Sequence, residues 1–234
     1  MDKLHLKDLR KSIHQELLPN LKLESVDPHE PVLVLYLPEP WKLVGRGNYA
    51  AVVYHPEYPE EVVKIYAPGR AGFEEEWEVY KRLGSHPAYS QCVYAHEGLL
   101  VLKRLHGITL YDCMHHGIRI PPRVIRDIDS ALNYARDCGL FPHDIHGRNV
   151  MMHRGRGLVV DVSDFLHMDK CHKWKHLKQA YYCLYLPIFY PLKVQVSYSI
   201  LNKVRRTYRR ISHWQRKKNM ICERQSNCIT ESIK

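Results

Sequence analysis

Three polar side chains in the second half of this 234-residue chain could act together on a phosphate group. Asp144 and Asn149 lie in the segment 141–150, and Asp161 follows the apolar run 158–160. Transfer of a phosphoryl group needs a carboxylate that receives or orients the proton of the attacking hydroxyl. It also needs oxygen ligands that hold Mg²⁺ against a triphosphate. These three residues supply that set.

Two histidines, His143 and His146, flank Asp144 and raise the alternative of a metal site for hydrolysis. Such a site needs a third protein ligand at suitable spacing, and the sequence offers none near this pair. A metallohydrolase is therefore the weaker hypothesis.

A second candidate pair lies in the first half of the chain. Lys64 falls in a Val- and Ile-rich run that predicts a strand, where a lysine ordinarily faces solvent. Glu76 falls in a predicted helix, 73–83, and shares its apolar face with Tyr80 and Leu83. A carboxylate on an inward face needs a cationic partner, because burying an unpaired charge is costly. Lys64 is the candidate partner; the alternative is a solvated run of acidic residues.

Gly45 and Gly47 lie in a turn between two predicted strands, 41–44 and 50–54. A glycine pair in such a turn lets backbone N–H groups approach phosphate oxygens, because no Cβ intervenes. The turn does not open a helix, so the dinucleotide-binding fingerprint does not fit. For the pair taken alone, an ordinary hairpin turn remains the alternative.

The elements that position these residues change in character along the chain. Beyond an amphipathic helix at 3–18, the first part is rich in strands and has the single helix 73–83. The second part opens with a helix that begins at Pro121 and Pro122 and closes at Gly139. Strands are predicted at 31–37, 41–44, 50–54, 62–66 and 98–104, a hairpin at 150–160, and helix in the remainder to about residue 211. The pattern predicts an α+β protein with two lobes and a cleft between them.

Taken in chain order, the glycine turn, the Lys64–Glu76 pair and the polar residues of the second half resemble the motifs of the protein kinase superfamily over roughly residues 41–165. The resemblance implies an antiparallel β-sheet N-lobe with one helix and a reduced, mainly α-helical C-lobe. More narrowly, segments 143–149 and 159–165 resemble small bacterial proteins classed as serine/threonine protein kinases. The implied parts are a helical extension at 1–30, an N-lobe at 31–104, a C-lobe at 105–213 and a polar tail at 214–234.

The resemblance implies ATP and Mg²⁺ as cofactors and assigns residues to the nucleotide. Three residues of the first hairpin would bind ATP: Gly45, Gly47 and Val52. Lys64 would contact the α- and β-phosphates and pair with Glu76, and backbone groups of Lys103 and Leu105 would bind the adenine edge. We expect Lys64→Ala to lower turnover more than stability, because a solvent-exposed ion pair contributes roughly 0–1 kcal/mol.

The resemblance also assigns the second lobe. Asp144 matches the catalytic aspartate, which acts with Lys64 and Glu76, while Asn149 and Asp161 match the Mg²⁺ ligands. Two departures stand out: the arginine expected before the aspartate is replaced by a histidine, and the lysine expected two residues after it is His146.

The motif expected to read Asp-Phe-Gly reads Asp-Val-Ser at 161–163, and a second acid, Asp164, precedes Phe165. Asp161 is preferred as the ligand because it directly follows the apolar run, with Asp164 as a second candidate. No Ala-Pro-Glu motif follows, and about seventy residues remain, so the resemblance implies a truncated C-lobe.

An ATP-dependent phosphotransferase with a serine/threonine protein acceptor is the favoured function. Because His146 replaces a lysine and the C-lobe is short, a kinase of a small molecule, such as a sugar or a lipid headgroup, is the first alternative. A nucleotide-binding pseudokinase with a regulatory role is the second. Retention of all the nucleotide and metal residues together counts against it.

The net charge of +10 is concentrated near the C-terminus. The segment 203–218 holds eight basic residues and no acid, so the rest of the chain is nearly neutral and specific nucleic-acid binding is not expected. Apolar residues at helical spacing, Leu201, Val204, Tyr208 and Ile211, predict an amphipathic helix. Such a helix could dock by its apolar stripe or bind an anionic membrane surface.

Composition and the termini point to a cytoplasmic protein. Seven scattered cysteines without a Cys-x-x-Cys pair favour reduced thiols over a disulfide framework. The N-terminal segment has no continuous apolar core, and the most apolar run, 180–196, is broken by Pro187, Pro191 and Lys193. We therefore expect neither a secretory signal nor a membrane span.

Overall fold

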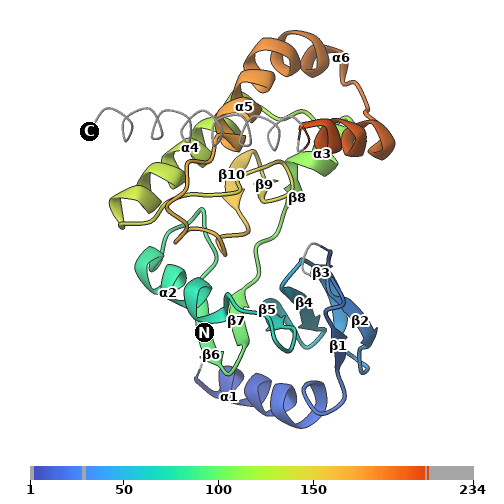
Figure 1. Ribbon diagram of the computed structural model, residues 1–234, viewed down its shortest axis with the longest axis vertical. Coiled ribbons are helices and arrows are strands. Elements are labelled where there is room, and N and C mark those ends of the chain that lie inside the picture. Colours follow the sequence, from blue (N-terminus) through green and yellow to red (C-terminus); the bar gives the residue numbers. More distant parts are fainter. Residues whose placement is uncertain (1–2, 28–29, 209, 211–234) are drawn as a thin grey trace, which may run out of the picture.

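The fold has two lobes that follow one another along the chain (Figure 1). It is known from a computed structural model that describes residues 3–27, 30–208 and 210. The first lobe contains, in order, α1 (Lys3–Ser12), η1 (Ile13–Leu17), β1 (Lys22–Glu24), β2 (Leu33–Tyr36), β3 (Lys42–Arg46), β4 (Ala50–His55), β5 (Tyr58–Tyr66), α2 (Phe73–Leu83), β6 (Cys92–His96) and β7 (Leu99–Lys103).

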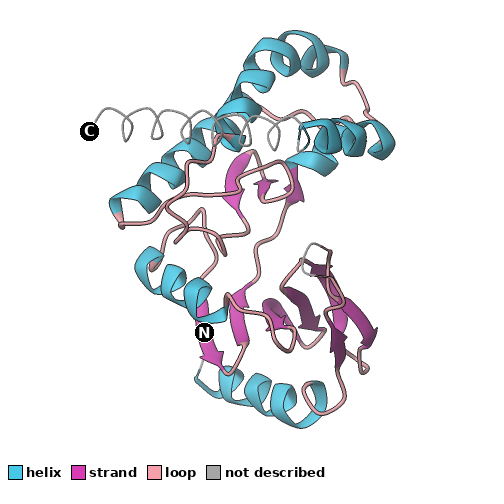
Figure 2. Ribbon diagram, in the orientation of Figure 1, coloured by secondary structure: helices cyan, strands magenta, loops and turns pink. Residues whose placement is uncertain are grey.

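The second lobe is mainly helical. It contains β8 (Ile108–Thr109), α3 (Leu110–His116), α4 (Pro122–Asp137), β9 (Val150–His153), β10 (Arg156–Val159), α5 (Lys173–Ala180), η2 (Tyr181–Phe189), α6 (Tyr190–Leu192) and a helix over 198–208. Strands predominate in the first lobe and helices in the second, as Figure 2 shows. The predicted α+β, two-lobe architecture is confirmed.

A five-stranded antiparallel sheet, in the order β3-β4-β5-β7-β6, forms the body of the first lobe. Successive side chains of a strand point to opposite faces, and β5 shows the consequence. Val63 and Ile65 belong to the core under α1 and η1, while Val62 and Tyr66 belong to the core shared with α2 and the second lobe. Lys64 lies in register with this second set, on the face that carries α2.

The N-terminal helix covers the other face of the sheet. Its apolar side chains Leu9, Ile13 and Leu17 are 1% exposed or less and pack with Trp41 and Val101. The helix continues from α1 into the wider, π-type helix η1 without a break, which agrees with the single helix predicted over 3–18. The segment expected as an extension therefore closes one of the hydrophobic cores of the first lobe.

The second lobe is built on α4, whose apolar stripe is fully buried. The short sheet β10-β9-β8 packs against this helix. At Gly157 the two elements approach so closely that a Cβ would lie 2.4 Å from the carbonyl oxygen of Val124, so only glycine fits there. The Gly157 N–H donates to Asp127 on the same helix (3.1 Å), which fixes the hairpin that carries the chain toward Asp161.

The two lobes are joined behind the site by contacts between the α2–β6 loop and α4. The Tyr134 hydroxyl donates to the carbonyl of Leu83 (2.8 Å), and the Tyr89 hydroxyl donates to the carbonyl of Ala131 (2.7 Å). The His86 ring stacks on Tyr134 with 4.3 Å between centroids. One continuous core runs through this junction into both lobes.

Several expectations about the elements are corrected. The short elements β1, β6, β8 and α3 are not anticipated from the sequence, and residues 161–172 and 193–197, which were expected to be helical, are not. The helix over 198–208 forms, but its predicted apolar stripe is not buried as a unit: Val204 is 62% exposed, and Ile211 lies outside the described residues.

Among the described residues, none of the helices combines the length and the apolar character that crossing a bilayer requires.

Candidate active site

Lys64 and Glu76 form an ion pair between β5 and α2. The ammonium lies 2.6 Å from Glu76 Oε2, and the side chains are 14% and 1% exposed. The Tyr66 hydroxyl donates to the same carboxylate oxygen, whereas Glu76 Oε1 is buried without a hydrogen-bond partner in the described structure. The sequence predicted this pair from the inward position of Glu76, and the structure brings the two residues together.

Asp161 reaches Lys64 from the second lobe. Its Oδ1 atom lies 3.6 Å from the Lys64 ammonium and accepts the Ser163 N–H (3.2 Å). Burial alone would lower the pKa of Lys64, but the charges of Asp161 and Glu76 outweigh it and hold that pKa above its usual value. Lys64 therefore stays protonated and joins two carboxylates from the two lobes.

The carboxylates that flank Lys64 respond to it differently. Burial raises the pKa of Glu76 and prevails over the attraction of Lys64, because this side chain lies within the core. For Asp161, burial would raise the pKa, but Lys64 and the Ser163 N–H outweigh it and lower that pKa. Asp161 is thus the carboxylate that remains ionised and part-exposed, as a cation ligand must.

The segment from Asp144 to Asn149 is held by backbone contacts. Asp144 has a φ of 53°, in the left-handed region that few non-glycine residues adopt and that is enriched at functional sites. Asn149 Nδ2 donates to the Asp144 carbonyl (3.1 Å), which leaves its Oδ1 atom for another partner. The Val160 N–H donates to the Asn149 carbonyl (2.9 Å), so Asn149 lies beside the residue that precedes Asp161.

These oxygens suit Mg²⁺. That ion is commonly bound by one or two protein carboxylates together with substrate phosphates and water. Asp161 and the Oδ1 of Asn149 offer one carboxylate and one amide oxygen. No cluster of three His, Cys, Asp or Glu side chains with metal-binding geometry occurs in the described part of the chain.

Asp164, the second candidate ligand, lies on the same side of the site. Burial raises its pKa, and the charges of Asp144 and Asp161 raise it further. Neighbouring Phe165 is fully buried, and its backbone carbonyl accepts the Phe141 N–H (2.7 Å), which ties this segment to the one carrying Asp144. Asp161, and not Asp164, forms the ion pair with Lys64.

The sequence did not anticipate Lys173, whose ammonium donates to Asp144 Oδ1. This lysine opens α5 and follows the non-helical segment 160–172. No spacing rule links it to Asp144, because the contact depends on the path of that segment. His146 Nε2 lies 3.9 Å from the other oxygen of Asp144.

Some of the first-lobe backbone groups that were predicted to contact the nucleotide already form hydrogen bonds within the protein. Gly47 N–H donates to the Ala50 carbonyl (2.9 Å) and so closes the turn, although open space lies where a Cβ of Gly45 or Gly47 would be. Lys103 N–H donates to the Gln91 carbonyl (2.9 Å), and its carbonyl accepts the Ser90 hydroxyl (2.6 Å).

Two predicted nucleotide residues remain accessible in the described structure. The Leu105 backbone makes no hydrogen bond with other described residues, and it is the better placed of the two adenine-edge candidates. Val52 is partly buried and packs on the core shared with α2, so it lies on the same face of the sheet as Lys64.

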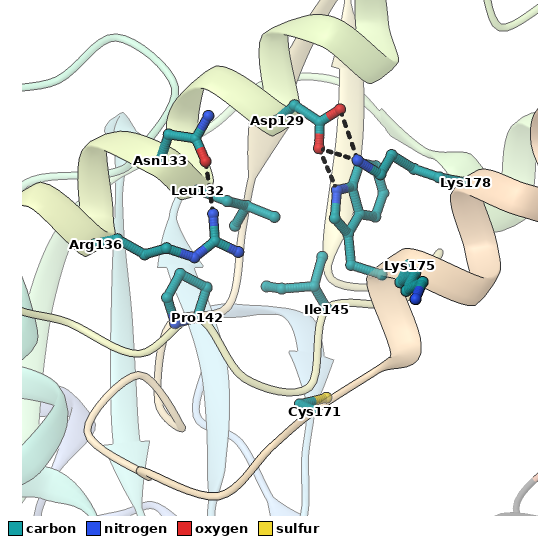
Figure 3. Close-up of a pocket in the computed structure, with 10 residues that line it drawn as sticks. Asp129, Leu132, Asn133, Arg136, Pro142, Ile145, Cys171, Lys175 and Lys178 are labelled. Atoms are coloured by element: carbon teal, nitrogen blue, oxygen red, sulfur yellow. Dashed lines mark hydrogen bonds and ion pairs between the residues drawn. The ribbon is translucent and has the colours of Figure 1, made fainter.

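A pocket of about 460 Å³ lies behind Asp144, between α4 and the start of α5 (Figure 3). Pro142 and Ile145, which flank Asp144, line it together with Asp129 and Lys178. This pocket is separate from Lys64, Glu76 and Asp161, and none of those three residues lines it.

The two-lobe fold and the order of these residues resemble those of protein kinases. A lysine on a central strand pairs with a helical glutamate, and an Asp144–Asn149 segment followed by Asp161 faces that pair from the second lobe.

The curated protein "Putative serine/threonine-protein kinase YrzF" from Bacillus subtilis (strain 168) is similar to this chain. It is 31% identical over 151 residues, which cover 64% of this chain and 65% of that protein. The chain thus matches just under two thirds of the relative's length. No protein family model matches the chain.

Solved structures similar to this fold include the Mycobacterium tuberculosis PknI kinase domain. A mutant form has a TM-score of 0.41 at 21% identity and covers 53% of this chain and 60% of that domain. The unmutated domain has a TM-score of 0.40 at 22% identity, with 52% and 58% covered.

Proposed function

We propose that this protein is an ATP-dependent phosphotransferase whose acceptor is a serine or threonine hydroxyl of a protein. The observation that carries the proposal is the position of Lys64 between Glu76 (2.6 Å) of the first lobe and Asp161 (3.6 Å) of the second. A structural ion pair needs only two partners. A third charged group from the other lobe is what a site for a metal-bound triphosphate requires.

Each residue has a role in the proposed reaction. Lys64, positioned by Glu76, binds the α- and β-phosphates. Asp161 and Asn149 hold Mg²⁺, which, when bound, neutralises phosphate charge and orients the triphosphate. Asp144 orients the acceptor hydroxyl and receives its proton as the oxygen attacks the γ-phosphorus.

The acceptor is proposed from the similarity to a relative whose name describes a serine/threonine-protein kinase. The alternative acceptor is a small molecule such as a sugar or a lipid headgroup, because His146 stands where a lysine is expected. A pseudokinase would keep nucleotide binding without transfer. For the location we propose the cytoplasm, where ATP is supplied and where the five described cysteines, all free, would remain reduced.

A transfer assay separates these possibilities. The protein is incubated with Mg²⁺ and ATP labelled at the γ-phosphate in a heat-inactivated cell extract, which is then split into protein and small-molecule fractions. We expect label in the protein fraction and its loss with Asp144→Asn. Label in the small-molecule fraction alone would favour the alternative acceptor, and equal transfer by Asp144→Asn would reject the catalytic assignment.

We also propose that the helix over 198–208 binds anionic membrane surfaces, since it exposes apolar and basic side chains together. Ile200 and Val204 are 56% and 62% exposed, and Lys203 and Arg206 beside them are exposed. Exposed apolar groups next to cations suit a headgroup interface. We expect co-sedimentation with phosphatidylserine vesicles that falls with salt and with Lys203→Glu plus Arg206→Glu. Equal sedimentation with pure phosphatidylcholine vesicles would contradict an electrostatic role.

A further inference from the structure

The side chain of Asp144 faces two candidate cations, Lys173 and His146. Lys173 donates to Oδ1, and the two side chains are 30% and 28% exposed, so the pair is open to solvent on one side. A surface ion pair of this kind contributes little to folding. Because Asp144 is the proposed catalytic base, its contact with Lys173 calls for a functional explanation.

His146 cannot supply a full positive charge in this arrangement. Its Nδ1 atom accepts the Arg148 N–H (3.3 Å), so that nitrogen carries no proton and the ring is neutral. Its Nε2 atom is 3.9 Å from Asp144 Oδ2, beyond hydrogen-bond distance. Lys64 is held by Glu76 and Asp161, and Lys173 is the ammonium group that contacts Asp144 among the described residues.

The position of Lys173 is fixed by its neighbour in α5. Trp174 is 7% exposed, and its indole N–H donates to Asp129 of α4 (2.7 Å). Lys178, one turn later, donates to both oxygens of Asp129 (2.8 and 3.0 Å). Figure 3 shows these contacts converging on Asp129 at the wall of the pocket behind Asp144. The start of α5 is thereby anchored on the helix that supports the second lobe.

We propose that Lys173 is a further catalytic residue that supplies, from α5, the cation missing at position 146. This inference rests on the proposed phosphotransferase function. As the acceptor oxygen forms its bond to the γ-phosphorus, the bond from that phosphorus to the bridging oxygen breaks and ADP leaves with the electron pair. Asp144 takes the hydroxyl proton. Lys173 stays protonated, contacts the transferred phosphoryl group and offsets the negative charge gathered beside Asp144.

The test compares four proteins in the transfer assay: wild type, Lys173→Met, Lys175→Met and the double variant Lys173→Met/His146→Lys. Lys175 lies on the same helix, is exposed and makes no ion pair with a described residue, so Lys175→Met is a matched control. Calorimetry of Mg-ATP binding and thermal unfolding are recorded for each. These readouts separate catalysis from nucleotide affinity and from folding.

We expect Lys173→Met to lower the maximal transfer rate about 100-fold, the loss typical of one charge-stabilising group. Its affinity for Mg-ATP and its unfolding temperature should stay near those of wild type and Lys175→Met. The double variant should recover part of the rate, because a lysine at position 146 approaches the same carboxylate. Recovery would not occur if Lys173 served only to hold α5 in place.

Other results would overturn the inference. A Lys173→Met protein as active as wild type, while Asp144→Asn is inactive, would reject the role of Lys173 alone. A faster Lys173→Met protein would show that the ion pair restrains Asp144 instead of assisting it. A wild-type protein that binds Mg-ATP but transfers no phosphate would reject the proposed function and, with it, this role.

Discussion

At the scale of single residues, the buried carboxylate of Glu76 requires the positive charge of Lys64. It is 1% exposed, one of its oxygens has no described hydrogen-bond partner, and Lys64 supplies the compensating charge. The expectation that loss of Lys64 would cost only roughly 0–1 kcal/mol assumed an exposed pair. The pair is buried, so that expectation is corrected: removing Lys64 leaves an unpaired carboxylate in the core.

We expect Lys64→Met to lower the free energy of unfolding by about 3 kcal/mol, as breaking a buried ion pair does. The double variant Lys64→Met/Glu76→Gln should recover part of this loss, since a neutral amide needs no cation and can still accept the Tyr66 hydroxyl. Urea denaturation of the single and double variants measures both effects. Equal destabilisation by the single and the double variant would show that Glu76 does not need the charge of Lys64.

The sequence predicts those site residues that lie on regular elements or in short local motifs, and it misses a contact that depends on an irregular segment. Glu76 was predicted because the periodicity of its helix reveals the inward face, and Lys64 was predicted as the cation that this carboxylate needs. Asp144, Asn149 and Asp161 were predicted because their order and flanks are local. Lys173 was missed, since its contact with Asp144 depends on the path of the non-helical segment 160–172, which no periodicity describes.

At the scale of elements, α1 and η1 complete the core beneath the sheet that carries Lys64. The sequence predicted this helix from its apolar spacing but could not show what it covers, because the partner side chains belong to strands far along the chain. Short elements such as β1, with three residues, carry too little pattern to be predicted at all.

We expect Leu17→Ala to lower the free energy of unfolding by about 3 kcal/mol, because a fully buried leucine is removed from under the sheet. The neighbouring Leu18 is 36% exposed, so Leu18→Ala should change stability by no more than about 0.5 kcal/mol. Chemical denaturation of both variants provides the comparison. Similar losses in the two would show that the helix does not cover the core.

At the scale of the whole molecule, the contact of His86 with Tyr134 joins the lobes in a pH-sensitive way. Burial lowers the pKa of His86, and its Nδ1 atom accepts the Ala88 N–H (3.2 Å), which requires a neutral ring. The folded protein therefore binds a proton at this residue less readily than the unfolded chain does. The stability that His86 contributes is complete above its ordinary pKa of about 6.5 and falls as the pH drops below it.

Comparison with His86→Asn isolates this effect, since asparagine can still accept the Ala88 N–H but does not titrate. The comparison is needed because the raised pKa of Glu76 makes the folded protein more stable, not less, as the pH falls. We expect wild type to lose more stability than the variant between about pH 7.5 and 5.5. Identical losses in thermal unfolding at the two pH values would contradict the prediction.

We propose that the two lobes bring Lys64 and Asp161 together to hold metal-bound ATP. Calorimetric titration with ATP, with and without Mg²⁺, tests it on wild type, Asp161→Asn and Asp164→Asn. We expect wild type to bind ATP saturably and only with Mg²⁺. Asp161→Asn should lower the affinity about tenfold or more, and Asp164→Asn should lower it less. Binding by Asp161→Asn that equals wild type, or no binding by wild type, would contradict it.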